Sequence, residues 1–266
     1  MFALSIALTL DRLEAIKSCL LKALPDVKSS HRCEALGRGL GFSSYAAARA
    51  SASGQEGPVV TVDGEAFVRY LARHEFHVQA RSLYFAVAKV AIHAVAEANP
   101  QLTSIGIGIG RPTRIGRRWQ TTEERIAEFR DGRSHLLGDD TLDGFLASLA
   151  FLARVTPTKT IRQGTSSYWL KHIAENYVCT YPEGDRLGPV YVPNGILIAA
   201  ALHSGFRMKT AVDEGGWPEL NVSFNMSTQG LNDLDCEIRP DGARAQDRRW
   251  REDQRRTRGR YGSVHA

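Results

Sequence analysis

The chain has 266 residues, of which 43% are hydrophobic and 24% charged, a composition typical of a globular protein with one large or two modest domains. No apolar run reaches the roughly 18–20 residues of a membrane-spanning helix, and the apolar start lacks the basic residues and cleavage site of a signal peptide. The formal net charge of +5 lies entirely within residues 239–266, so the rest of the chain balances to zero.

The first predicted elements are a strand near residues 2–9 and an amphipathic helix from about residue 11 to residue 24. Residues 30–52 follow with two short helical segments joined by a turn at Gly41, which has no side chain to oppose the positive φ angle of such a turn. This spacing is typical of a helix-turn-helix, and small Gly37 lets the second helix pack closely. An αα-hairpin that serves only as scaffold has the same pattern.

The second helix of this motif is the candidate recognition helix. Ser43 or Ser44 can cap it, and we expect Ser44, Tyr45, Ala48 and Arg49 to face a partner, for which a DNA major groove is the first candidate. Because the helix is short and rich in alanine, few of its side chains can reach base edges. Contact through Arg49 and Ser44 is therefore the central expectation.

Residues 51–58 are rich in Ser and Gly and predict an exposed linker. A short strand is expected at residues 59–62, followed by a helix over about 65–76 that Asp63 caps. A longer Ala-rich helix is predicted over about 79–99. Its apolar residues occupy more than one face, which indicates a central, buried helix.

Residues 103–110 alternate Ile with Gly and predict a strand with one bare face. They do not match a phosphate-binding loop, because the GxGxxG spacing and the Walker lysine are missing. An arginine cluster follows, with Trp119 available for base stacking, so we predict a second basic contact with nucleic-acid phosphates. The arginines of this cluster are Arg111, Arg114, Arg117 and Arg118.

The second half of the chain predicts more helices than strands. A capping box from Thr121 to Glu124 opens one helix, and others are expected over 142–154, from 166 onward and over 191–206, before a closing strand at 221–227. The fold class that follows is mostly α or α+β, a helix-rich body with a few short strands and an N-terminal helix-turn-helix-like hairpin. The predicted division is a helical region (1–53), a main domain (59–230) and an Arg-rich tail (231–266).

One helix carries a possible catalytic group. Tyr168, His172 and Glu175 are spaced to share a face, with Lys171 beside them, which suits general acid–base chemistry or metal binding with a ligand from elsewhere. A single His on a partly apolar helix is, however, more often structural. We therefore assign no catalytic residue.

The sequence predicts no metal site and no cofactor. His74 and His77 form an HxxH pair around Glu75, but no third ligand lies nearby, so a surface pair is the preferred interpretation. The four cysteines include no CxxC pair, which favours free thiols in a reducing cytoplasm over a zinc ribbon or a redox motif.

The C-terminal segment carries the excess positive charge. Residues 239–266 hold nine arginines and four acidic residues, and hydrophobic residues become sparse after Gly230. We expect disorder from residue 239 until a nucleic acid binds, the alternative being a solvated terminus with no specific role. The arginines predicted to contact nucleic acid are Arg248, Arg249, Arg251, Arg255, Arg256, Arg258 and Arg260.

Two segments resemble uncharacterised proteins of proteobacterial plasmids and integrative conjugative elements. One is LPDVKSSHRCEALGRGLGFSSYAA at residues 24–47, and the other joins SYWLKHIAE at 167–175 to YVPNGILIAAALHSGF at 191–206, together just under a fifth of the chain. The resemblance implies a bacterial, cytoplasmic, mobile-element setting. It carries over no activity and no catalytic residue.

These observations predict a non-enzymatic nucleic-acid-binding protein of a mobile element, with DNA favoured over RNA and a homodimer or larger nucleoprotein complex expected. Two alternatives stay open. One is a protein that blocks a host defence or another nucleoprotein complex by direct contact, and the other is a hydrolase or nuclease centred on His172.

Overall fold

A computed structural model describes residues 3–54, 57–161, 164–181 and 184–262, the last six of these by their backbone alone. Within these residues the chain forms eleven α-helices and several short two-stranded antiparallel sheets, and it is 53% helical. The predicted helix-rich α+β class is confirmed. In the same described part of the chain, no helix is both long enough and apolar enough to cross a membrane.

The α-helices are α1 (Leu10–Ala23), α2 (Ser29–Gly39), α3 (Tyr45–Ala52), α4 (Gly64–Ala72), α5 (Arg81–Ala98), α6 (Thr122–Leu136), α7 (Leu142–Leu152), α8 (Ser167–Ala174), α9 (Asn194–His203), α10 (Thr228–Ile238) and α11 (Ala243–Gly262). The strands are β1 (Ser5–Ala7), β2 (Val59–Thr61), β3 (Leu102–Thr103), β4 (Gly106–Ile107), β5 (Arg114–Ile115), β6 (Arg118–Trp119), β7 (Cys179–Thr180), β8 (Arg186–Leu187), β9 (Met208–Lys209) and β10 (Ser223–Phe224). A 3-10 turn, η1, covers Asp139–Thr141.

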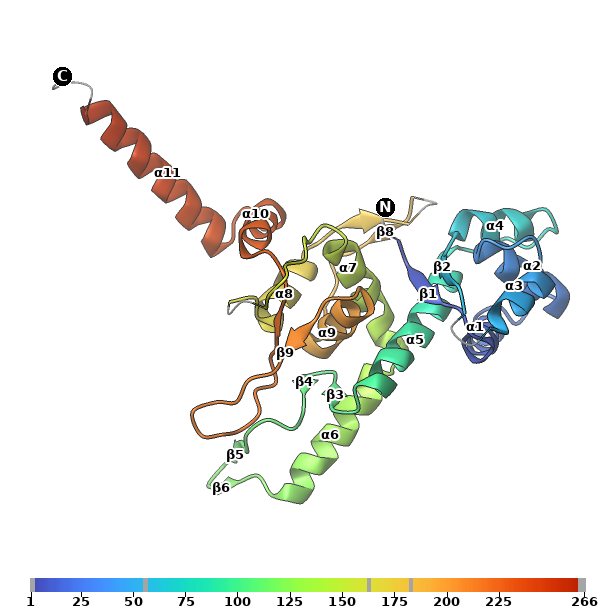
Figure 1. The fold of residues 1–266 in the computed structure, drawn as a ribbon, viewed down its shortest axis with the longest axis horizontal. Helices are drawn as coiled ribbons and strands as arrows, with labels where there is room; N and C mark the ends of the chain where they lie inside the picture. Colours follow the sequence, from blue (N-terminus) through green and yellow to red (C-terminus); the bar gives the residue numbers. More distant parts are fainter. Residues whose placement is uncertain (1–2, 55–56, 162–163, 182–183, 263–266) are drawn as a thin grey trace.

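Helices α1–α4 gather into a lobe at one end of the molecule, and β1 pairs with β2 beside it (Figure 1). Helix α2 packs against α3 and α4, and α1 packs against α5, the long helix that leads into the rest of the protein. These contacts cross the linker predicted at residues 51–58, and α10 spans the predicted boundary at residue 230. The division into domains stays a prediction.

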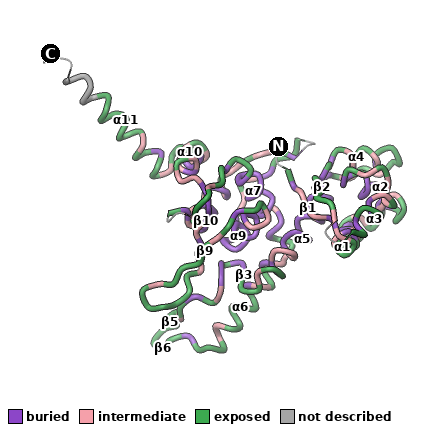
Figure 2. The backbone as a smooth tube through the Cα atoms, in the orientation of Figure 1, coloured by how far each residue is buried: buried purple, intermediate pink, exposed green. Residues whose placement is uncertain are grey.

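The centre of the protein is the pair α7 and α9, with α5 and α8 packed against them (Figure 1). Figure 2 shows that burial concentrates here, and every residue of α9 from Asn194 to Ala201 is buried. The sequence explains this placement, because a short helix that is apolar on all sides must be enclosed by other elements. One continuous hydrophobic cluster joins this centre to the α1–α4 lobe.

Several predicted helix ends are confirmed. The Ser44 hydroxyl accepts a hydrogen bond from the Ala47 amide at 3.1 Å, and the Asp63 carboxylate accepts one from the Ala66 amide at 2.8 Å. The capping box of Thr121 and Glu124 is present on α6. These ends are readable in the sequence because each cap involves residues only three positions apart.

The strand predicted over residues 103–110 is wrong. The segment instead folds into β3 and β4, which pair across a tight hairpin and do not continue as one strand. Gly108 and Gly110 have φ angles of 76° and 64° and turn the chain where a strand would extend it, and Gly106, the first residue of β4, has a φ of 143° that residues with a side chain rarely adopt. The alternation of Ile and Gly reflects these turns rather than a bare sheet face.

The disorder expected from residue 239 is also contradicted, because residues 243–262 form α11. Figure 1 shows this helix projecting from α10, away from the rest of the chain. Its first turns are held by ion pairs from Arg244 to Asp235 and from Arg248 to Asp233, and Arg251 pairs with Asp247 one turn earlier. Charge pairs four residues apart support a helix that has little apolar surface to bury.

Candidate functional sites

Helices α2 and α3 form the predicted helix-turn-helix pair. A side chain at Gly37 would lie 2.6 Å from the carbonyl carbon of Ser44 and from the amide nitrogen of Tyr45, so the two backbones are in direct contact there. Gly41 has a φ of 84° in the turn between the helices. Both glycines therefore have the roles expected of them.

The face that α3 presents differs from the expected one. Ala48 is completely buried and faces the core, so it cannot meet a partner. The Tyr45 hydroxyl donates a hydrogen bond to Glu14 of α1 at 2.9 Å, and burial together with this bond raises the pKa of the phenol. Tyr45 thus anchors α3 on α1, while Arg49 is exposed. The cause is the 3.6-residue period, which turns positions 45 and 48 toward α1 and α2 and leaves 46, 49 and 50 outside.

The arginine cluster at residues 111–118 lies on the exposed hairpin β5–β6. Arg114 pairs with Trp119 and Ile115 with Arg118 across the hairpin, and Gly116 turns it with a φ of 61°. The Arg118 guanidinium donates hydrogen bonds to both carboxylate oxygens of Glu124, at 2.7 and 2.5 Å. Arg118 and the Thr121 amide lower the pKa of Glu124 to about 2, so the charge of Arg118 is balanced.

The other three arginines of the cluster, Arg111, Arg114 and Arg117, are exposed and have no ion pair with any described side chain. Arg111 and Arg114 border a cleft of about 1000 Å³ that also contains Trp119 and Trp217. Sequence analysis missed Trp217, because it lies on a loop about a hundred residues further along the chain.

Helix α11 carries most of the remaining candidates. Arg244, Arg248 and Arg251 are engaged in ion pairs, whereas Arg249, Arg255 and Arg256 are exposed and have no ion pair within the described residues. The side chains of Arg258 and Arg260 lie outside the described residues. The free arginines are on a helix that projects into solvent (Figure 1).

Asp235 fixes the base of α11, although the sequence did not single it out. It is 2% exposed, and its carboxylate accepts hydrogen bonds from Arg239 at 2.6 Å and from the Trp169 indole at 2.8 Å. Arg244 of α11 pairs with the same carboxylate at 3.3 Å and stacks on Trp169 at 4.1 Å. Asp235 therefore joins α8, α10 and α11.

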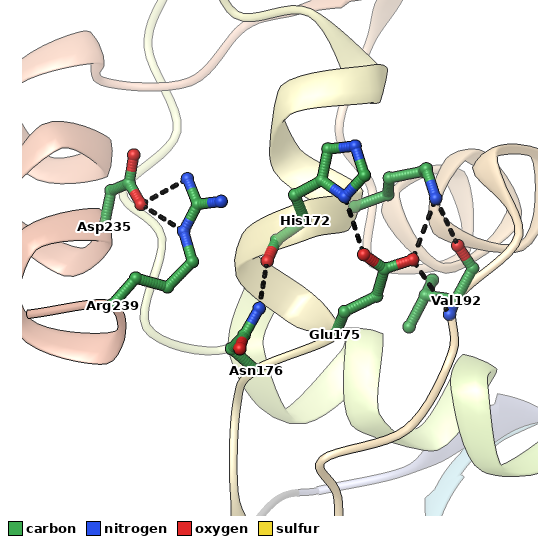
Figure 3. A network of polar contacts seen from close by, with 7 residues as sticks. His172, Glu175, Asn176, Val192, Asp235 and Arg239 are labelled. Atoms are coloured by element: carbon green, nitrogen blue, oxygen red, sulfur yellow. Dashed lines mark hydrogen bonds and ion pairs between the residues drawn. The ribbon is translucent and has the colours of Figure 1, made fainter. Parts of the chain in front are cut away.

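The residues predicted to share a face of α8 do lie together. Figure 3 shows His172 beside Glu175, with the His172 Nδ1 atom 2.7 Å from Glu175 Oε2. The Tyr168 ring meets the His172 ring edge-on, with 4.8 Å between the ring centres. Lys171 Nζ donates to the other Glu175 oxygen at 2.8 Å. Burial raises the pKa of Glu175, but the hydrogen bonds from Lys171 and His172 outweigh it, so the pKa lies below its ordinary value and the carboxylate is ionised.

This cluster also ties α8 to the segment before α9. Lys171 is 6% exposed and donates to the Val192 carbonyl at 3.4 Å, and the Val192 amide donates to Glu175 at 3.4 Å. His172 borders an open pocket of about 460 Å³ between α8 and residues 189–191. Lys171 and Glu175 are thus partly structural, whereas the His172 side chain is 37% exposed and reaches solvent.

The HxxH pair is not on a helix, because α4 ends at Ala72. The His74 ring lies against the rings of His31 and Tyr70, with ring centres 4.3 and 4.7 Å apart and the ring planes tilted. Across the described ranges, no three His, Cys, Asp or Glu side chains come together in a way that could hold a metal ion.

The three predicted nucleic-acid-binding surfaces lie in separate parts of the molecule. In Figure 1 the α2–α3 pair lies at the right, β5–β6 at the lower left and α11 at the upper left. A search of protein-family models, of curated proteins and of solved structures finds no match for this chain.

Proposed function

We propose that the protein binds duplex DNA, with α3 in the major groove and α11 against the phosphate backbone. The observation that carries this proposal is the geometry of α2 and α3. Their backbones touch at Gly37, Gly41 turns the chain between them, and Arg49 stands on the exposed side of the second helix. A helix held across a partner helix in this way suits groove insertion.

The charge of α11 supports the proposal. Arg249, Arg255 and Arg256 have no carboxylate partner among the described side chains, and Figure 1 shows α11 extending away from the other helices and strands. Arginine on a projecting helix suits phosphate contacts, which add affinity without reading sequence. A homodimer on a symmetric site fits the short α3, because one such helix reads few base pairs. The resemblance to plasmid and conjugative-element proteins agrees with a DNA-handling role.

Replacing Arg49 in one variant and Arg249, Arg255 and Arg256 of α11 in another separates the groove contact of α3 from the phosphate contacts of α11. We expect Arg49→Ala to weaken binding to a duplex selected from a random-sequence pool by about 1–3 kcal/mol, because it removes a base or groove contact. The triple change Arg249→Gln, Arg255→Gln and Arg256→Gln lowers affinity for all duplexes alike. It also reduces the slope of the logarithm of the binding constant against the logarithm of the salt concentration. The reduction is about one unit for each of these arginines that contacts a phosphate in the wild type.

The measurement is fluorescence anisotropy with a labelled duplex across a KCl series. Arg186→Ala is the matched control, because this arginine is exposed on β8 and belongs to neither surface. If neither Arg49→Ala nor the triple variant differs from Arg186→Ala, DNA binding through α3 and α11 is wrong.

A second candidate function is hydrolysis of phosphodiesters with His172 as general base. The observation that favours it is the 2.7 Å contact from His172 Nδ1 to Glu175, which leaves Nε2 free to accept a proton from a water or hydroxyl in the pocket. Burial and ionisation of Glu175 hold the imidazole in this orientation.

The test is cleavage of supercoiled plasmid and of RNA with and without Mg²⁺ or Mn²⁺. We expect His172→Gln to lower the rate by about 10²–10⁴-fold while the unfolding midpoint stays unchanged. His135→Gln is the control, because His135 also contacts a carboxylate (Asp140, 2.9 Å) at an exposed site. Equal rates for the two variants would rule out a catalytic His172.

A further inference from the structure

The cleft between the β5–β6 hairpin and residues 211–218 is built from two segments far apart in sequence. Its loop side is held by an isolated bridge between Val212 and Pro218 and by Asp213, whose Oδ1 accepts hydrogen bonds from the Gly215 and Trp217 amides at 2.9 Å each. The volume of about 1000 Å³ is at the upper end of the range for ligand pockets.

Two tryptophans offer flat apolar surface in this cleft. Trp119 is 66% exposed and Trp217 is 41% exposed. The Arg125 guanidinium lies 4.9 Å from the Trp217 ring centre and donates to the Gly110 carbonyl, which fixes the ring. Arg125 and Trp217 also border a second, neighbouring cavity. Trp217 lines both this cavity and the cleft, whereas Arg125 lines the second cavity alone. Arg125 thus supports the Trp217 ring from the side of the second cavity, and the ring is also accessible from the cleft.

Gln120 lines the same cleft and has a buried, unpaired donor. It is 7% exposed, and its Oε1 accepts hydrogen bonds from the Thr113 amide at 3.3 Å and hydroxyl at 3.0 Å. Its Nε2 has no partner anywhere in the described chain. A buried N–H without a partner costs free energy, so a ligand that brings a carbonyl oxygen to Gln120 gains from satisfying it.

The charged groups around the cleft are of both signs. Arg111 and Arg114 lie on the hairpin side, and the Glu214 carboxylate and the free oxygen of Asp213 lie on the loop side. A nucleotide matches this arrangement: its phosphate suits the arginines, its ring suits the tryptophans, and amino and carbonyl groups on the base edge suit the carboxylates and Gln120. In a duplex, the faces and pairing edges of the bases are hidden.

We propose that this cleft binds unpaired cytosine-type bases of a single-stranded nucleic acid, stacked on Trp119 and Trp217. The base carbonyl meets Gln120, and the exocyclic amino group meets Glu214 or Asp213. The proposal rests on the nucleic-acid-binding function above, but it assigns single strands to a surface separate from α3 and α11.

The test compares fluorescein-labelled oligo(dC) and oligo(dT) of equal length on the full chain by anisotropy at pH 8. Thymine has a carbonyl where cytosine has its amino group, so oligo(dC) is expected to bind about tenfold more tightly. Trp119→Ala and Trp217→Ala are each expected to weaken oligo(dC) binding by about tenfold or more, and Trp217→Tyr restores it because stacking returns. Gln120→Glu removes the donor, keeps the acceptor for Thr113 and weakens binding by a similar factor.

Trp250→Ala is the matched control, because Trp250 is an exposed tryptophan (61%) on α11. Wild-type affinity in Trp119→Ala and Trp217→Ala, or an equal loss in Trp250→Ala, overturns the assignment to the cleft. Equal affinity for oligo(dC) and oligo(dT) overturns the proposed base contacts. Duplex binding measured in parallel distinguishes the two proposals: if it persists without single-strand binding, only the cleft proposal fails, and the reverse result rejects only α3 and α11.

Discussion

Gly195→Ala is expected to destabilise the protein by about 4 kcal/mol or more, a large part of the stability of a typical domain. A Cβ atom at residue 195 would overlap the Thr103 carbonyl oxygen and lie 2.8 Å from its carbon. Both atoms belong to the backbone of β3, so no rotamer change relieves the overlap. The Gly195 amide also donates to the Ser104 carbonyl at 2.9 Å, a bond that would break as α9 shifts.

The measurement is urea denaturation followed by circular dichroism. Gly230→Ala is the matched control, because a Cβ there meets only the Ser227 side chain at 3.6 Å or more and α10 is a helix that favours Ala over Gly. We expect Gly230→Ala to stay within about 1 kcal/mol of the wild type. Similar unfolding midpoints for both variants would show that α9 and β3 do not pack as described.

Asp235→Ala has the second-largest expected effect, a decrease of about 3 kcal/mol in the free energy of unfolding. The change leaves Arg239 and the Trp169 indole without their buried acceptor and releases Arg244. The loss falls at the lower end of the range for a broken buried ion pair, because the side chain of Arg244 is 52% exposed and regains water. Since Arg244 belongs to α11, the same change frees the basic helix from α8 and α10.

Asp233→Ala on the same helix is the control. Asp233 pairs with Arg248 at 2.6 Å but is 56% exposed, so we expect a change within about 1 kcal/mol. Denaturation reports stability, and limited trypsin digestion at the arginines of α11 reports how firmly the helix is held. Lower stability is expected for Asp235→Ala alone, and cleavage is expected to increase more in Asp235→Ala than in Asp233→Ala, because the exposed Asp233–Arg248 pair also holds α11. If both variants behave alike, Asp235 does not anchor α11.

Part of the candidate surfaces was predictable because neighbouring residues in the sequence create them. The α2–α3 pair follows from Gly37, Gly41 and Ser44, and the contact of His172 with Glu175 follows from a spacing of three on a helix. Only the hairpin side of the cleft was predictable. Trp119 and the arginines lie together in sequence, but Trp217 reaches them through the folded chain.

The sequence by itself determined the helix-rich class, the positions of most helix ends and the concentration of charge in α11. Each depends on composition or on residues within one or two turns of each other. Only the tertiary structure decided that Ala48 is buried, that Asp235 joins three helices, and that Gly195 touches β3. Each of these features is a contact between segments that lie far apart along the chain. No local sequence pattern says which two distant segments meet, because that choice is made by how the whole chain packs.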